Sequence, residues 1–304
     1  MNRSLLWLVL GVFCLASAHG ADSTRHVVII TLDGCTPRMF QDEYAKTLKS
    51  LWSRGCYTWE AQTVMPSVTM TAHASLLTGL TPARHGVNSN DWRPEDGEGL
   101  NATTLLELAR KAGLQTAFVA SKAKLRQLDK PGTASVSYYP RSAMEELGYD
   151  PAKPDGPRRA PFDTVKAVRK CFEAIVPNVL FVHFAQPDLT GHTFGWESDE
   201  YVYAFRQLDQ QLGVLLADWK RTGFLEDNTM IIVTADHGGH EKTHGTNEHS
   251  DMTIPWIVWG PNVRKNHELQ TPVRIDDTAA TAAYFLKLKV PKTWDGRVIT
   301  EIFR

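Results

Sequence analysis

Long apolar runs with an acidic residue at or just beyond their end place the strongest constraint on how this 304-residue chain folds. Three of them are VVIITLD (27–33), NVLFVHF (178–184) and NTMIIVTAD (228–236). Continuous β-branched and apolar segments of this length are typical of strands buried on both faces of a parallel sheet. Amphipathic helical patterns lie between them, such as the one that carries Leu208, Leu212 and Leu215 on one face. The alternation predicts an α/β sandwich with a mostly parallel central sheet flanked by helices.

Composition sets the size and class of the protein. With 42% hydrophobic residues, the chain can bury one substantial core, and we expect a single catalytic domain over 22–304. A formal net charge of −1 gives no electrostatic reason to bind a nucleic-acid polymer or anionic lipid. The segment 93–159 is rich in Pro, Gly and charge at its two ends, which indicates a small cap or insertion over the site.

The first 21 residues have the pattern of a cleavable signal peptide. Arg3 precedes an apolar run, and the small-residue stretch Ala16-Ser17-Ala18 follows it. A membrane anchor is the alternative, but a span needs about 20 apolar residues and this run is shorter. No later segment is long and apolar enough to span a membrane. We therefore expect a periplasmic or secreted protein, in which Cys35, Cys56 and Cys171 allow at most one internal disulfide.

Metal-capable side chains gather where the predicted strands end. Asp33, Asp188 and Asp236-His237 follow the three runs, and open α/β sheets bind ligands beyond the carboxyl ends of their strands. His192 lies four residues after Asp188, one helical turn away, and His244 follows in THG. One such Asp is usually a helix cap, but three ends of this kind are hard to explain as caps. Three carboxylates and three imidazoles suit two divalent ions, and mixed ligands of this kind favour zinc.

Displacement at phosphorus in a two-metal site also needs a nucleophile, and a side-chain hydroxyl can serve as one. The stretch PSVTMTAHASLLTGL (66–80) offers Ser67, Thr69, Thr71 and Ser75, and the two threonines stand where a helix is expected to begin. A helix N-terminus favours anions, so either hydroxyl could face a phosphate. Threonine at this position more commonly caps the helix. Physical reasoning on the residues alone leaves the two threonines and the two roles open.

Together these segments resemble the alkaline phosphatase superfamily, in particular its type I phosphodiesterase/nucleotide pyrophosphatase branch. The matching stretches are VVIITLDG, PSVTMTAHASLLTGLTPARHGV, QPDLTGH, TADHGG and THGTNEHSDMTIPWIVWGP. They cover nearly the whole chain after the expected signal peptide. The family pattern Pro-x-x-Thr-x-x-x-His-x-Ser selects Thr69 over Thr71, because Pro66, His73 and Ser75 stand at the matching offsets. Many relatives have Asn directly before the motif His, where this chain has Ala72.

The resemblance implies a role for each site residue. Asp33, Thr69, Asp236 and His237 would hold one zinc ion, with Thr69 as the nucleophile that forms a phospho-threonine intermediate. Asp188, His192 and His244 would hold the second ion; among His240, His244 and His249, His244 fits the family spacing best. Asn90 would donate to a non-bridging phosphate oxygen. The substrate implied is a small phosphate ester or nucleotide.

Other functions compete with this hypothesis. The CTPRMF stretch nearly matches the sulfatase signature, but Arg38 comes one residue early and Cys35 lies outside the nucleophile segment. A phosphomonoesterase is the nearer rival, since a monoester dianion needs extra cations, which Lys122 and Lys124 could supply; a solvated basic helix start is the alternative for both. Trp92 could stack on a base or simply pack. A non-catalytic metal-binding relative would have lost a ligand or the nucleophile, and none is missing.

Overall fold

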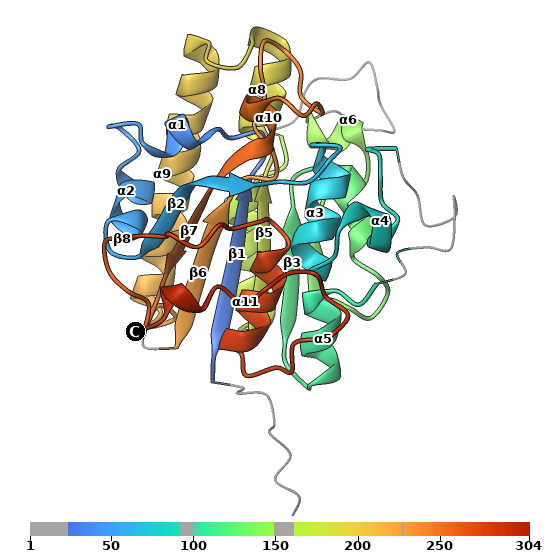
Figure 1. Cartoon of the computed structure of the whole chain (residues 1–304), viewed down its shortest axis with the longest axis vertical. Helices are drawn as coiled ribbons and strands as arrows, with labels where there is room; N and C mark the ends of the chain where they lie inside the picture. The colour runs from blue at the N-terminus through green and yellow to red at the C-terminus, as the bar shows by residue number, and fades with distance from the viewer. Residues whose placement is uncertain (1–23, 92–99, 101, 149–160, 227) are drawn as a thin grey trace, which may run out of the picture.

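The computed structural model describes residues 24–91, 100, 102–148, 161–226 and 228–304. Within them, eight strands form one sheet in the order β4-β3-β5-β1-β6-β7-β2-β8 (Figure 1). The strands are β1 (His26–Leu32), β2 (Cys56–Gln62), β3 (Thr116–Ala120), β4 (Val136–Tyr138), β5 (Val179–Phe184), β6 (Thr229–Thr234), β7 (Thr253–Trp259) and β8 (His267–Glu268). Neighbours from β4 to β6 are parallel, while β7 is antiparallel to both β6 and β2.

Helices cover both faces of this sheet. They are α1 (Pro37–Phe40), α2 (Lys46–Trp52), α3 (Thr69–Thr78), α4 (Pro82–His85), α5 (Leu105–Lys111), α6 (Ala143–Glu146), α7 (Thr164–Ala174), α8 (Gln186–Phe194), α9 (Asp199–Arg221), α10 (His249–Met252) and α11 (Asp277–Phe285), with 3-10 turns η2 (Ala123–Leu128) and η3 (Thr300–Ile302). Helices α3, α5 and α11 pack together on the near face in Figure 1, whereas α2, α7 and α8 pack on the long helix α9. The predicted α/β sandwich is confirmed.

Part of the expected cap region, 93–159, belongs to the main sheet and does not form a separate cap. Its middle forms α5 and β3, and β3 pairs with β5 inside the sheet. The ends, at 93–99 and 149–160, lie outside the described residues, as do Trp92 and the expected signal peptide. A cap formed by these ends therefore stays a prediction.

The strand register brings four strand ends to one edge of the sheet. Leu32 of β1 pairs with Phe184 of β5, and Thr31 pairs with Thr234 of β6. Ala120 at the end of β3 pairs with His183 of β5. Because these strands run parallel, the residues that follow them must meet at the same edge. The core strands are fully buried, which fixes this register from both faces.

The three cysteines of the described region are free and buried. Burial raises the pKa of the Cys171 thiol to about 12 and that of Cys56 to about 11. Packing of the apolar core therefore holds the described fold without a disulfide among these residues. Among the helices described, none combines the length and the apolar character needed to cross a membrane.

His85 is expected to make stability depend on pH. It is 1% exposed, and its Nδ1 accepts from the Val87 N–H at 3.1 Å, so its Nε2 donates to Ser75 Oγ at 2.9 Å. Burial lowers its pKa to about 4, and the charge of Asp295 only partly opposes this. The unfolded chain binds this proton near pH 6.5, so stability is lost as the pH falls from 6.5 towards 4.

Between pH 7 and pH 5 this one group is expected to lower the free energy of unfolding by about 2 kcal/mol. Urea unfolding at the two pH values would measure the change. The matched variant is His85→Gln, because glutamine can both donate and accept at this position without titrating. Equal pH dependence in the two proteins would show that His85 is not responsible.

Candidate metal centre and active site

Three carboxylates and one imidazole converge at the edge where the strands end. The His237 Nε2 atom lies 3.3 Å from Asp236 Oδ2, 3.4 Å from Asp33 Oδ1 and 4.0 Å from Asp188 Oδ1. All four side chains are at most 2% exposed. Asp33 directly follows β1, Asp236 and His237 come two and three residues after β6, and Asp188 lies in the first turn of α8, so the strand register brings their segments to the same edge. The structure thus joins the strand-end residues that the sequence singled out.

The imidazoles of His192, His237 and His244 are oriented in the same way. In each ring Nδ1 is hydrogen-bonded to a backbone carbonyl: Lys242 O at 3.0 Å, Gly238 O at 2.7 Å and Ser67 O at 2.9 Å, respectively. Because a carbonyl can only accept, Nδ1 donates in each ring, and Nε2 is the nitrogen left to face a cation. The Nε2 atoms of His192 and His244 lie 3.4 and 3.5 Å from Asp188 Oδ1. Metal-binding histidines are fixed in this way by outer partners.

The buried atoms at the centre fit a divalent cation. Asp33 Oδ1, Asp188 Oδ1, Asp236 Oδ2 and His237 Nε2 have no hydrogen-bond partner in the described part of the chain. Their donors form two overlapping groups, Asp33/Asp236/His237 and Asp188/His237/His244, each within 4.8 Å. Burial would lower the pKa of His237, but Asp236 and Asp33 raise it to about 9, so this place attracts positive charge. Carboxylate and imidazole donors of this number suit zinc and related ions.

The geometry shows which of His240, His244 and His249 belongs to the second group. His244 stacks on His237 with ring centroids 3.7 Å apart and reaches Asp188. His240 instead bonds Asp251 through Nδ1 at 2.8 Å, and His249 Nδ1 lies 3.0 Å from Thr253 Oγ1. His192, which was predicted as a member of the second group, lies beside it: its Nε2 is 3.4 Å from Asp188 Oδ1, 44% of its side chain is exposed, and His237 stands in that group instead.

Thr69 is the first residue of α3 and is fully buried at this edge. Val68 precedes it in extended conformation, and no side chain of this segment caps the helix. The Asn90 amide oxygen accepts from the Met70 N–H at 3.1 Å, which places the Asn90 side chain beside Thr69 with its NH2 group as the remaining donor. Thr69 Oγ1 therefore lies at a helix N-terminus with an amide donor nearby, an arrangement that favours an anion.

Lys122 enters the site from the end of β3. It is 4% exposed, and its Nζ lies 2.8 Å from Asp33 Oδ2, 2.5 Å from Asp188 Oδ2 and 3.3 Å from Thr69 Oγ1. Burial would lower its pKa, but the charges of Asp188 and Asp33 outweigh burial and raise it. The alternative of a solvent-facing basic turn does not apply to Lys122. Lys124 is half-buried, and burial together with the charge of Lys122 lowers its pKa.

Two further histidines support the centre, and sequence reasoning missed their part. His183 Nε2 bonds Asp33 Oδ2 at 2.7 Å, while its Nδ1 accepts from the Ser121 N–H at 3.3 Å. His73 bonds the Thr69 carbonyl through Nδ1 at 2.8 Å and Thr31 Oγ1 through Nε2 at 2.9 Å. Burial lowers the pKa of His73 to about 4, so it stays neutral. For His183, the only signal in the sequence was a polar histidine inside the apolar run NVLFVHF.

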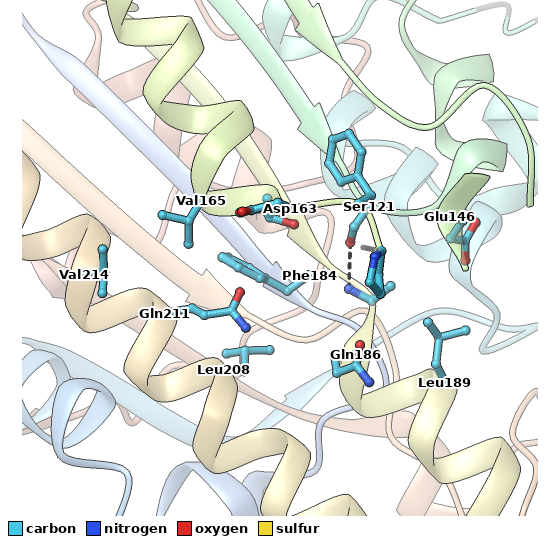
Figure 2. Close-up of a pocket in the computed structure, with 14 residues that line it drawn as sticks. Ser121, Glu146, Asp163, Val165, Phe184, Gln186, Leu189, Leu208, Gln211 and Val214 are labelled. Atoms are coloured by element: carbon cyan, nitrogen blue, oxygen red, sulfur yellow. Dashed lines mark hydrogen bonds between the residues drawn. The ribbon is translucent and has the colours of Figure 1, made fainter. Parts of the chain in front are cut away.

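The cavity of about 500 Å³ shown in Figure 2 is not the candidate site. It lies between β5, α8 and α9, with Ser121, Phe184 and Gln186 on its wall. None of the predicted metal ligands lines it. Ser121 directly precedes the site residue Lys122, and Gln186 comes two residues before Asp188 in α8. The cavity therefore lies close to the metal centre, with the first turn of α8 between them.

Comparison with known proteins finds relatives over much of this chain. An uncharacterized pyrophosphatase/phosphodiesterase of Schizosaccharomyces pombe is 25% identical, over 70% of this chain and 44% of that protein. Venom phosphodiesterase 2 of Crotalus adamanteus is 24% identical, over 71% of this chain and 27% of its own length. The chain thus spans less than half the length of these two curated relatives.

Solved structures agree on the fold. Murine ectonucleotide pyrophosphatase/phosphodiesterase 5 superposes with a TM-score of 0.72 at 16% identity, covering 92% of this chain and all of that one. An inactive form of the same murine protein, in complex with AMP, gives 0.72 at 15% identity, with the same coverage. The family model described as type I phosphodiesterase/nucleotide pyrophosphatase matches residues 27–277. The chain with these converging strand ends therefore belongs to the type I phosphodiesterase/nucleotide pyrophosphatase family.

Proposed function

We propose that this protein is a two-metal phosphohydrolase that uses Thr69 as its nucleophile. The observation that carries the proposal is the position of the Thr69 hydroxyl. It lies at the N-terminus of α3 and is linked through Lys122 to Asp33 and Asp188, two of the buried carboxylates. Asp33, Asp236 and His237 would hold one ion, while Asp188, His192 and His244 would hold the other. When bound, the ions supply activation of the nucleophile and charge neutralisation at the leaving oxygen.

The residues of the chain perform the remaining steps. Thr69 Oγ1 attacks phosphorus, the ester oxygen leaves, and water then hydrolyses the phospho-threonine. The NH2 group of Asn90 donates to a non-bridging phosphate oxygen. His73 holds the Thr69 carbonyl, and His183 holds Asp33, so the nucleophile and one ligand are fixed before substrate binds.

The proposed substrates are phosphodiesters or pyrophosphates of nucleotide type. Family membership supports this class, and so does the AMP complex of the murine neighbour. The pattern of the first 21 residues supports export to the periplasm or the extracellular space. A small-molecule ester is favoured over a nucleic-acid polymer, since the net charge of −1 offers no strong attraction for one.

A phosphomonoesterase is the second candidate, and Lys122 is the observation that favours it. A phosphate monoester dianion has three non-bridging oxygens that share its negative charge, whereas a diester has two. A buried ammonium 3.3 Å from the nucleophile oxygen can donate to a third one. Lys122 therefore provides a cation where a dianionic phosphoryl group would bind.

A paired assay on zinc-loaded protein separates the two candidates. It compares kcat/KM for bis-p-nitrophenyl phosphate, a thymidine monophosphate p-nitrophenyl ester and p-nitrophenyl phosphate. Preference for the two diesters is the result expected of a phosphodiesterase. Preference for the monoester would move the assignment to phosphomonoesterase, and absence of hydrolysis with all three would contradict both.

Lys122→Met is expected to lower kcat/KM for p-nitrophenyl phosphate about 10- to 100-fold more than for the diesters. A hydrogen bond from a charged donor contributes about 1.5–3 kcal/mol, which corresponds to this range. Arg126→Met is the matched control, because Arg126 lies on the same 3-10 turn but is exposed and bonds the Arg141 carbonyl. An equal loss for monoester and diester would show that Lys122 does not contact the third oxygen.

A further inference from the structure

Trp196 lies against His192 and His244, two of the three proposed ligands of the second ion, without being a ligand itself. Its ring centroid is 5.2 Å from that of His192, with the rings at 87°, and 5.9 Å from that of His244, at 61°. Both contacts are edge-to-face, the geometry that aromatic pairs prefer. Trp196 is only 7% exposed. The indole thus touches both imidazoles assigned to the second ion from the protein side.

The same indole presses against backbone next to other ligands. A Cβ added at Gly191 would lie 2.8 Å from Trp196 Cδ2, and one added at Gly239 would lie 2.2 Å from Cε2. Both distances are too short for any side chain. Gly191 directly precedes His192, and Gly239 comes two residues after His237. The ring therefore packs directly on the backbone of two ligand-bearing segments.

Hydrogen bonds hold the indole in place. Its Nε1 donates to the Gly34 carbonyl at 2.8 Å, directly after Asp33. The Trp196 N–H donates to the Glu241 carbonyl at 2.7 Å, in the loop that leads to His244. Tyr201 Oη also donates to the Gly34 carbonyl, at 2.7 Å. Hydrogen bonds thus join Trp196 to the ligand-bearing segments after β1 and β6, to the first through the indole and to the second through the backbone.

We propose that Trp196 is a positioning residue that sets the affinity of the second metal ion, by holding His192 and His244 at the distance that a shared ion requires. The inference rests on the proposed two-metal function. Outer residues that orient ligands typically change metal affinity by about 10- to 100-fold. Trp196 reaches the ligands of the first ion only through the backbone of Gly34 and Gly239, whereas it contacts two imidazoles of the second, so the larger effect is expected on the second ion.

The test is a titration of metal-free protein with Co²⁺, followed by visible absorption and by competition with Zn²⁺. Native protein is expected to bind two equivalents. In Trp196→Ala the second equivalent is expected to bind about 10- to 100-fold more weakly, with little change in the first. Trp196→Phe keeps an aromatic ring in this place but loses the Nε1 donor and part of the ring area, so its loss of affinity is expected to be smaller than that of Trp196→Ala.

Trp294→Ala is the matched control. Trp294 is 8% exposed and packs on Gly79, where an added Cβ would lie 2.8 Å from its ring, at the end of α3 remote from Thr69. Its replacement is expected to lower stability while both equivalents keep their affinity. Unchanged binding of both ions in Trp196→Ala would overturn the inference, and so would an equal loss in Trp294→Ala. Fewer than two equivalents in native protein would instead overturn the proposed function.

Discussion

Replacing Thr69 by alanine is expected to lower kcat/KM by at least about 10³-fold, on whichever ester the protein hydrolyses best. The physical reason is that the covalent step needs an oxygen nucleophile at this point. Thr69 Oγ1 is buried at the start of α3, next to Lys122. Alanine removes that oxygen and leaves the helix intact. Steady-state kinetics on the preferred ester would measure the loss.

Thr71→Ala is the control for this variant. Thr71 is the other threonine of the segment and is just as buried, and its hydroxyl has no hydrogen-bond partner among the described residues. Its loss is expected to leave turnover within a few-fold of native. Trapping with substrate at low pH should label a peptide that contains Thr69 in the native protein and in Thr71→Ala, but not in Thr69→Ala. Full activity in Thr69→Ala, or a label elsewhere, would mean that another group attacks phosphorus.

Removing divalent metal is expected to abolish activity and to lower the melting temperature. Asp33, Asp188 and Asp236 are buried within a few Å of one another, and Lys122 is the one ammonium bonded to them in the described part of the chain. Buried charges of like sign are costly unless they are compensated. An ion present at 100 times its Kd adds about 2.7 kcal/mol to stability. Thermal unfolding with a chelator, and again after zinc is restored, would measure this contribution.

Asp236→Asn is expected to lose most of this metal-dependent stabilisation, because it removes a charge from the first ligand group. Asp209→Asn is the matched variant, since Asp209 is also buried but accepts from the Thr47 and Leu48 N–H groups. It should lower stability equally with and without zinc. If zinc raised the melting temperature of Asp236→Asn as much as that of the native protein, the proposed first ligand group would be wrong.

The sequence by itself determined the class of fold and the residues that converge. Apolar runs such as VVIITLD specify buried strands, because only a strand covered on both faces hides so many β-branched side chains. Parallel strands end at one edge, so Asp33 and Asp236 had to approach each other there. These inferences need only local pattern and strand direction. The antiparallel course of β7 was not predicted, because it depends on how β2 and β6 pack around it.

Only the tertiary structure decided which nearby groups complete the site. The pattern SKAKLRQL allows Lys122 to face solvent or the core, and contacts with Asp33 and Asp188, far away in sequence, decide between them. His183 is an ordinary member of an apolar strand until its register places it on Asp33. Trp196 has no motif around it, and its place against His192 and His244 follows from close packing on two glycines. Such contacts arise from long-range packing, which leaves no periodic trace in the sequence.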